Sequence, residues 1–343
     1  MAGIFDADKA GMLPIADVGD AIFFIESSVN PFMRLIKTGR TPTQMIHSWP
    51  GQVREDRGFE GVLDGVDKVD GYGHSLTTPL QNCLMKLVSQ GWLVSDFAQI
   101  TVRAGVKDEV KKQMGDDAFD FARQVERQVM SAAAARIQDK GKAYQSGGLL
   151  WWANSAATVS DAENTYLTVP EQFRPLAAQR HAGDLSALTA TAFEAMLRAT
   201  AERQNAPVDL TFFAGSALKR LMSLWMQRDT AATPGTATAI YSLNAKEKRL
   251  AQAVEFFEFD SGSVRTIQTF NLACDPATGA KTAYSTRSGV GVDMSLVEMC
   301  YGRKIKAWVD NTKSGGPRGH HDAIYTLRNN MPANQISVWS NKD

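Results

Sequence analysis

The chain has 343 residues, 44% of them hydrophobic and 22% charged. These ordinary globular values exclude disordered, collagen-like and membrane-embedded classes, and the length leaves room for about two or three packed units. Lysine plus arginine balance aspartate plus glutamate at 37 each, so the sequence indicates no overall basic surface for gripping phosphates, and weak repulsion between copies favours self-association.

The three cysteines, Cys83, Cys274 and Cys300, are far apart and have no CxxC spacing, which argues against a disulfide framework or a zinc ribbon. A reducing cytoplasm therefore fits best. The N-terminus has acidic residues where a signal peptide would carry lysine, and its apolar run at 22–25 is too short to span a bilayer. We expect no cleavable export signal.

Residues 1–44 predict an N-terminal arm, because short apolar patches alternate with prolines and the only helical stretch lies near 17–27. Such a segment lies either on its own domain or on another subunit, and the sequence leaves both open.

A long hairpin loop is predicted next. Residues 45–53 read as a strand interrupted at Pro50 and Gly51, and residues 80–94 as an extended segment broken at Gly91. Between them, 54–75 is rich in glycine and carries six acidic against three basic residues. Connections longer than about 12 to 15 residues are usually functional or disordered, so the length of this loop calls for an explanation.

Two helices are predicted after the loop, at 107–114 and about 117–140, with Gly115 as a left-handed helix end and Asp116 as the next cap. The longer one is an amphipathic spine helix. Its apolar stripe is Ala118, Phe121, Ala122, Val125, Val129 and Ala133, and its outward face is Asp120, Arg123, Glu126 and Arg127.

The run GGLLWWANS at 147–155 ends this helix, and Trp151 and Trp152 are interpreted as core anchors because no basic residues are interleaved with them for stacking on bases. An irregular polar stretch follows to Gly183.

A second compact α/β unit begins at Leu188, with Thr189 as the cap of a helix that stops at Asn205 and Pro207. We expect a buried strand at 209–213, a helix capped by Ser216, and a hairpin whose turn is at Gly262. Further extended runs are predicted at 304–309, 323–327 and 335–339.

A search for chemistry yields no catalytic, cofactor-binding or metal-binding residue. His320 and His321 are neighbours that point to opposite sides of a strand, and His47, His74 and His181 have no partner spacing. A GxSxG turn around Ser216 would need glycine where Leu218 stands. The glycine-rich run 314–321 lacks phosphate-loop spacing and is interpreted as a flexible inter-strand loop.

Six segments in this order resemble the Hong Kong 97-type (HK-97-like) major capsid proteins of tailed bacteriophages. They are NPFMRLIKTGRTPTQMIHSW at 30–49, the helix-Gly115-helix step, GGLLWWANS, Leu188-Thr189 before a helix, the FFEFDSGSV hairpin, and LRNNMPANQISVW near the C-terminus. The resemblance covers most of residues 28–340. Two segments depart from the family pattern: the loop before Ser75 is richer in acids, and 156–183 is irregular.

The resemblance implies an α+β fold with an N-terminal arm (1–44), an extension loop (45–97), a peripheral domain with spine helix and insertion (98–185), an axial domain (186–290) and returning strands of the peripheral domain (291–343).

The resemblance also implies a structural, non-enzymatic protein without cofactors, located in the virion after assembly in the host bacterial cytoplasm. Its main partner is itself, in pentamers and hexamers of an icosahedral head that encloses double-stranded DNA without sequence-specific binding or a membrane. Portal and decoration proteins are further partners. A scaffold is expected as a separate protein, because the chain begins directly with the arm. The expected inter-subunit contacts of the extension loop are Trp49, Arg54, Asp56, Arg57, Glu60, Asp64, Asp67 and Asp70.

Two alternatives remain open from the sequence. One is an enzyme with an unusual site near Gly215 and Ser216, which a serine-directed probe would reveal. The other is a different virion component, such as a decoration protein or an encapsulating shell. A packaged genome would indicate the phage shell, and a packaged cargo enzyme would indicate an encapsulating shell.

Overall fold

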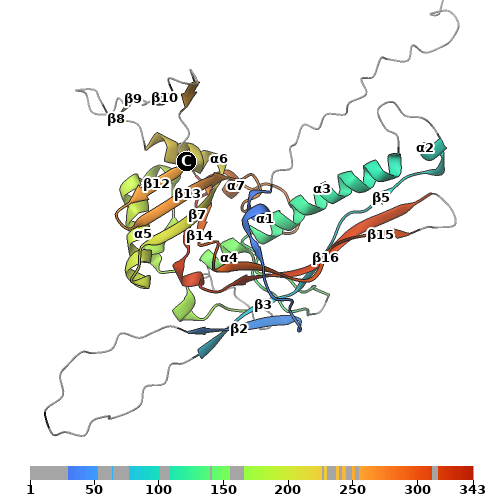
Figure 1. The fold of residues 1–343 in the computed structure, drawn as a ribbon, viewed down its shortest axis with the longest axis horizontal. Helices are drawn as coiled ribbons and strands as arrows, with labels where there is room; N and C mark the ends of the chain where they lie inside the picture. Colours follow the sequence, from blue (N-terminus) through green and yellow to red (C-terminus); the bar gives the residue numbers. More distant parts are fainter. Residues whose placement is uncertain are drawn as a thin grey trace, which may run out of the picture. The chain divides into compact units, whose positions relative to one another are not determined.

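A computed structural model describes residues 30–52, 64, 77–100, 108–139, 141–154, 166–225, 228–229, 237–238, 242–244, 249–251, 255–310 and 316–342 (Figure 1). The chain divides into two compact units. The smaller includes Val88–Phe121 and Lys306–Asp322, and the larger comprises Val29–Leu87, Ala122–Ile305 and Ala323–Asp343.

The helices are α1 (Pro31–Leu35), α2 (Asp96–Ile100), α3 (Glu109–Val129), α4 (Leu149–Asn154), α5 (Ala190–Gln204), α6 (Ser216–Leu224) and α7 (Ala283–Arg287). The strands before α5 are β1 (Lys37–Thr38), β2 (Ile46–Gln52), β3 (Thr77–Cys83), β4 (Met85–Val88), β5 (Trp92–Leu93) and β6 (Arg180–Ala182). Those after α5 are β7 (Val208–Ala214), β8 (Arg228–Asp229), β9 (Ala237–Thr238), β10 (Ser242–Asn244), β11 (Arg249–Ala251), β12 (Phe256–Phe259), β13 (Gly262–Gln268), β14 (Gly289–Val292), β15 (Val297–Asp310), β16 (Arg318–Asn329) and β17 (Ile336–Trp339).

A six-stranded mixed sheet in the order β12-β13-β7-β14-β17-β6 organises the larger unit. Its centre, β7, runs parallel to β13 and antiparallel to β14. The β12–β13 hairpin turns at Gly262, whose φ of 146° is the positive value expected from the sequence. This sheet therefore joins the predicted axial segment to the C-terminal strand β17.

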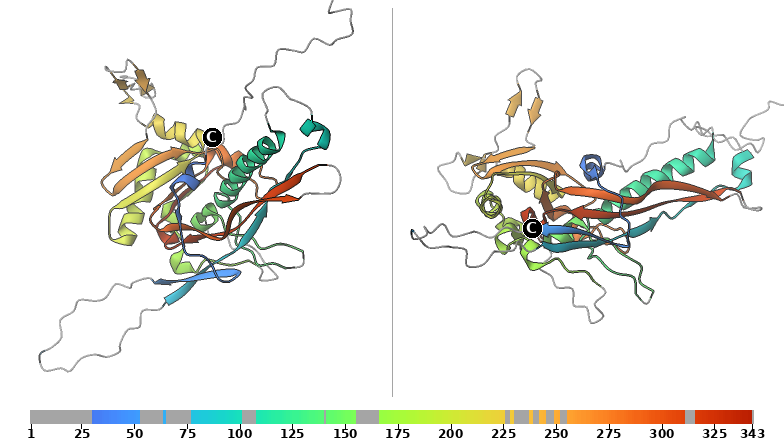
Figure 2. Two further views of the ribbon diagram at one scale, coloured as in Figure 1. Left: turned by 45° about the vertical axis from the view of Figure 1, so that its right-hand side comes forward. Right: turned by 60° about the horizontal axis from the view of Figure 1, so that its bottom comes forward.

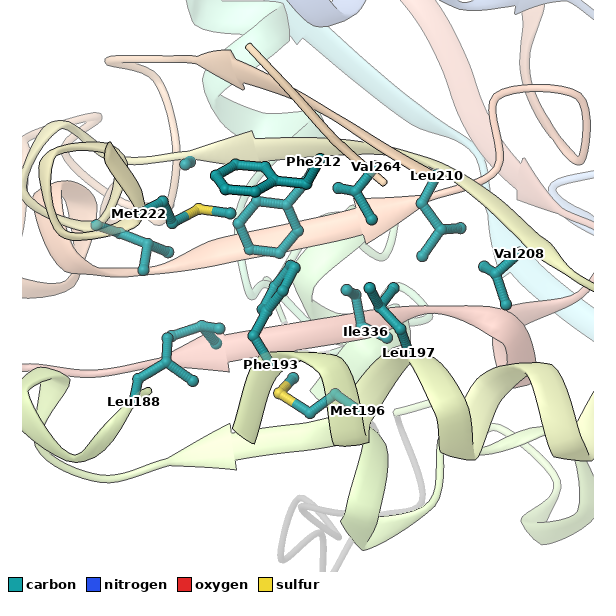
Figure 3. Packing of buried hydrophobic residues seen from close by; sticks show 14 of the residues in the cluster. Leu188, Phe193, Met196, Leu197, Val208, Leu210, Phe212, Met222, Val264 and Ile336 are labelled. Atoms are coloured by element: carbon teal, nitrogen blue, oxygen red, sulfur yellow. The ribbon is translucent and has the colours of Figure 1, made fainter. Parts of the chain in front are cut away.

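Helices α5 and α6 pack on one face of this sheet. Phe193 of α5 points toward Phe212 of β7, with ring centroids 5.3 Å apart in an edge-to-face arrangement, and Met222 of α6 joins the same cluster (Figure 3). The Thr189 side chain accepts the Ala192 N–H at 3.2 Å, and Asn205 ends α5 in the left-handed conformation. The predicted cap and stop of this helix are both confirmed.

The opposite face of β7 is covered by α1. Because neighbouring strand residues point to opposite sides, Phe213 faces away from Phe212 and meets Phe32 at 5.4 Å. Both phenylalanines are fully buried. The sheet is thus packed on both faces, which explains why the strand reads as a nearly continuous apolar run.

A second sheet has the order β1-β15-β16-β4, with β5 also paired to β16. Both views of Figure 2 show β15 and β16 as a long two-stranded ribbon. The three predicted C-terminal extended runs are confirmed, and two are longer than expected. The prediction of a loop at 314–321 was wrong for its second half, because β16 already begins at Arg318.

The spine helix differs from its prediction in three ways. Helix α3 runs without a break from Glu109 to Val129, so Gly115 does not end a helix and Asp116 does not cap one. A mid-helix glycine costs only about 1 kcal/mol, which packing of the helix can offset. The helix also stops at Val129, well before Lys140, and Glu126 is buried instead of facing outward.

Two smaller predictions, the cap of α6 and the interruption of β2, were wrong. Ser216 is the first residue of α6, and Gly215 holds the cap position. Strand β2 continues through Pro50 and Gly51, where Pro50 lies opposite Pro79 of β3. Two facing prolines fit a ladder at a non-hydrogen-bonded pair, since the missing N–H groups there would point away from the partner strand.

No helix within the described residues is long and apolar enough to cross a membrane.

Candidate functional site

The base of the charged loop is a regular antiparallel ribbon. Strands β2 and β3 pair from Ile46 opposite Cys83 to Gln52 opposite Thr77. The hairpin expected from the sequence is therefore confirmed at its base, where Gln52 and Thr77 lie directly opposite each other.

Trp49 of β2 fixes one strand of this base. Its indole Nε1 donates to the Asn329 carbonyl oxygen at 3.1 Å, and its ring lies 5.9 Å from that of Trp152 in α4. The Arg328 guanidinium also lies over the Trp49 ring, 5.9 Å from its centroid, and pairs with Glu298 at 3.4 Å. Only 4% of Trp49 is exposed, so its own chain encloses it.

Asn82 of β3 fixes the other strand. Its Nδ2 donates to the Leu327 carbonyl at 2.7 Å and to the Gly147 carbonyl at 3.3 Å. Its Oδ1 accepts the N–H groups of Gly147 and Cys83 at 2.7 and 2.9 Å. The side chain is fully buried with all its hydrogen-bonding capacity used. Both strands of the hairpin are thus tied to the end of β16.

The eight residues expected as extension-loop contacts have different positions. Trp49 lies at the buried root, and Asp64 is exposed in a turn. Arg54, Asp56, Arg57, Glu60, Asp67 and Asp70 lie outside the described residues. Contacts of all eight residues with another subunit stay predictions.

A buried carboxyl joins three distant segments. Glu126 of α3 accepts the Met33 backbone N–H at 3.3 Å through Oε2 and the Asn271 side-chain amide at 3.2 Å through Oε1. The same amide reaches Asn30 Oδ1 at 3.4 Å. None of the Glu126 side chain is exposed. The start of α1, the spine helix and the turn after β13 therefore meet at one group. No local pattern in the sequence indicates this junction.

Burial raises the pKa of Glu126 to about 7, against the lowering effects of the Asn271 amide, the Met33 N–H and the Arg34 charge. The carboxyl is therefore partly protonated near neutral pH. A buried group of this kind makes the local stability depend on pH.

In the smaller unit, a serine, a histidine and an aspartate are hydrogen-bonded together, but the arrangement does not activate the serine as a nucleophile. Asp117 Oδ2 accepts from Ser89 Oγ at 2.7 Å and lies 2.6 Å from His321 Nδ1. Ser89 Oγ in turn accepts the N–H groups of His321 at 2.9 Å and Gly91 at 3.2 Å. A catalytic triad needs histidine between serine and acid; here the acid is central, and the cluster ties α3 to β16 and the β4–β5 connection.

Other candidate nucleophiles are also unactivated. The three cysteines are free and buried, and burial raises the pKa values of Cys83 and Cys300 to about 11, so these thiols stay protonated. In the part of the chain that the structure describes, no histidine or carboxylate hydrogen-bonds to Ser216, and no group of three metal-ligating side chains occurs.

Comparisons with known proteins agree on one class. A family model described as the SU10 major capsid protein matches residues 4–320. A capsid chain of the cyanophage P-SCSP1u superposes with a TM-score of 0.57 at 13% identity, covering 100% of this chain and 96% of that one. A chain from Gordonia phage Cozz gives 0.57 at 13% identity, with coverages of 97% and 93%.

A capsid chain from a native GTA particle gives a TM-score of 0.56 at 10% identity, covering 97% of each chain. At such identities the likeness shows the fold alone, and it confirms the α+β capsid fold expected from the sequence. No curated protein matches the sequence.

Replacing Asn82 should loosen the root of the loop. Asn82→Ala leaves the Gly147 N–H and the Leu327 carbonyl buried without their partner, so we expect the free energy of unfolding to fall by about 2 kcal/mol or more. Chemical denaturation measures the change. The exposed neighbour offers a matched control, and Gln81→Ala should change stability by no more than about 0.5 kcal/mol. Equal effects of the two changes would contradict the anchoring role of Asn82.

Glu126 should make stability fall as pH rises. Its folded pKa of about 7 lies above the ordinary value of 4.5, so between these values the folded state keeps a proton that the unfolded state has released. Each pH unit in this window should lower the free energy of unfolding by up to about 1.4 kcal/mol relative to Glu126→Gln, which mimics the neutral carboxyl.

Denaturation of both proteins from pH 4 to pH 8 measures this difference. Glu258→Gln, at an exposed position of β12, is the control and should follow the wild-type curve. Parallel curves for wild type and Glu126→Gln would show that the carboxyl is not held neutral.

Proposed function

The chain belongs to the SU10 major capsid protein family, and on this premise we propose that its copies assemble as pentamers and hexamers into an icosahedral phage head around double-stranded DNA. The observation that carries the proposal is the family match over residues 4–320 of 343. The capsid folds of the structural neighbours support it.

The physical demands of such a shell fit this chain. Repeated head-to-tail contacts close into rings only when the geometry of each contact repeats, and one subunit can occupy both five- and six-fold rings only if part of it adapts. A hairpin with a fixed base and a long glycine-rich, charged loop combines both properties. We therefore assign the loop residues Arg54, Asp56, Arg57, Glu60, Asp64, Asp67 and Asp70 to contacts with a neighbouring subunit.

The same proposal places the chain in the virion after assembly in the host bacterial cytoplasm. Besides its own copies, its partners would be a scaffold protein, a portal and a decoration protein. The formal net charge of zero supports enclosure of DNA without sequence-specific binding, since no excess of basic residues is available for phosphates.

The role is structural and not catalytic. Support comes from the Ser89–Asp117–His321 cluster, in which the serine oxygen is engaged in three hydrogen bonds, and from the raised pKa values of the thiols. Both features favour packing over reactivity.

Electron microscopy of the purified or co-expressed protein tests the proposal. We expect closed shells, tubes or rings, and nucleic acid in particles recovered from infected cells. A strictly monomeric protein at high concentration would contradict the proposal. Particles that enclose an enzyme in place of nucleic acid would instead indicate an encapsulating shell.

A charge-reversed loop provides the second arm of this experiment. Asp64→Lys combined with Asp67→Lys and Asp70→Lys should leave thermal unfolding of the monomer unchanged while reducing particle yield. An unchanged yield would remove these three residues from the inter-subunit contacts.

A further inference from the structure

The last part of β15 is an exposed sheet edge. Residues 304–310 are all exposed, and they include Trp308 at 37% and Val309 at 52%. Strand β16 borders one edge of β15, while β1 pairs with the other edge only at Glu298 and Met299. At Ala307 and Val309, therefore, no strand of the described chain lies along the outer edge. Exposed apolar edges invite pairing with another chain.

The backbone at this edge is oriented for such pairing. Gly319 of β16 has no side chain, and the carbonyl oxygen of Trp308 occupies the space that a Cβ there would need. Trp308 thus directs its carbonyl toward β16. Because backbone groups alternate along a strand, those of Ala307 and Val309 point outward.

The sequence of this segment is complementary to itself. When two copies of Lys306-Ala307-Trp308-Val309-Asp310 are laid antiparallel and centred on Trp308, each Lys306 faces an Asp310 and each Ala307 faces a Val309. The two Trp308 residues face each other. Opposite charges and aromatic pairs directly across an antiparallel ladder are stabilising, whereas like charges are destabilising.

The Trp308 side chain is already ordered by contacts within its own chain. Its Nε1 donates to Asp322 Oδ1 at 2.9 Å, and the Lys306 ammonium lies 4.0 Å from its ring centroid on the same face of the strand. Little side-chain freedom would be lost on pairing, which lowers the cost of association.

We propose that residues Lys306–Asp310 form an antiparallel strand pair with the same segment of a second copy, across a two-fold axis centred on Trp308. The partner is a second copy because charge, register and backbone direction all match this segment to itself, as an isologous contact requires. The inference rests on the proposed shell function and names one of its inter-subunit contacts.

Charge reversal with rescue tests the pairing. Lys306→Asp places two acids opposite each other at both ends of the pair, so we expect particle yield to fall about tenfold or more. Adding Asp310→Lys again places opposite charges across the pair, now with the acid at 306 and the base at 310, and should restore the yield. Lys304→Asp makes the same charge change on an exposed residue of the same strand outside the segment, and it should have little effect.

Cysteine cross-linking tests the register independently. A chain carrying both Ala307→Cys and Val309→Cys should form disulfide-linked dimers of twice the 37.5 kDa chain mass within particles, because these positions face each other across the axis. Ala307→Cys alone should cross-link far less. The native cysteines are buried and should not contribute.

The outcomes separate the two proposals. If wild-type protein forms particles but Lys306→Asp has no effect, or Asp310→Lys fails to rescue it, the strand pairing is wrong and the shell function stands. If the double-cysteine variant forms particles without dimers, the register is wrong. Failure of the wild-type protein to assemble would instead overturn the proposed function itself.

Discussion

Attachment of the hairpin β2–β3 to the end of β16 is the constraint on which the rest of the structure depends. Asn82 and Trp49 make this attachment with buried hydrogen bonds to the backbone of Leu327, Gly147 and Asn329. No water can replace these partners. Releasing β2 or β3 would therefore leave buried polar groups without hydrogen bonds. Register follows as well, since a one-residue slip would turn Trp49 outward. The long charged loop therefore starts from a fixed place.

The Glu126 junction has a different character. Its carboxyl is buried among neutral donors, the α1 backbone and the Asn271 amide, so ionisation costs free energy that neutral hydrogen bonds only partly return. At the hairpin root, the Asn82 side chain is uncharged and has every hydrogen-bonding group paired. The free energy of the Glu126 junction depends instead on whether the carboxyl carries a proton. In a protein that must assemble, one attachment is thus fixed and the other responds to its surroundings.

Local signals in the sequence were enough to predict some elements and not others. Helix α5 was predictable because Thr189 caps it, an apolar stripe sets its face and Asn205 ends it, all within one segment. The continuity of α3 through Gly115 was not, because packing outweighs the glycine penalty. Burial of Glu126 was also hidden, since its partners Met33 and Asn271 lie 93 and 145 residues away. Asn82 gave no signal for the same reason.

Hydrogen–deuterium exchange, measured on the unassembled chain and on purified particles, tests most directly whether the loop at 54–75 contacts a neighbouring copy. Amides of β2 and β3 should exchange slowly in both forms, because they belong to the anchored ladder. Amides of residues 54–75 should exchange much more slowly in particles than in the free chain. Equal exchange of the loop in both forms would contradict a fixed hairpin base that carries a loop to the next subunit.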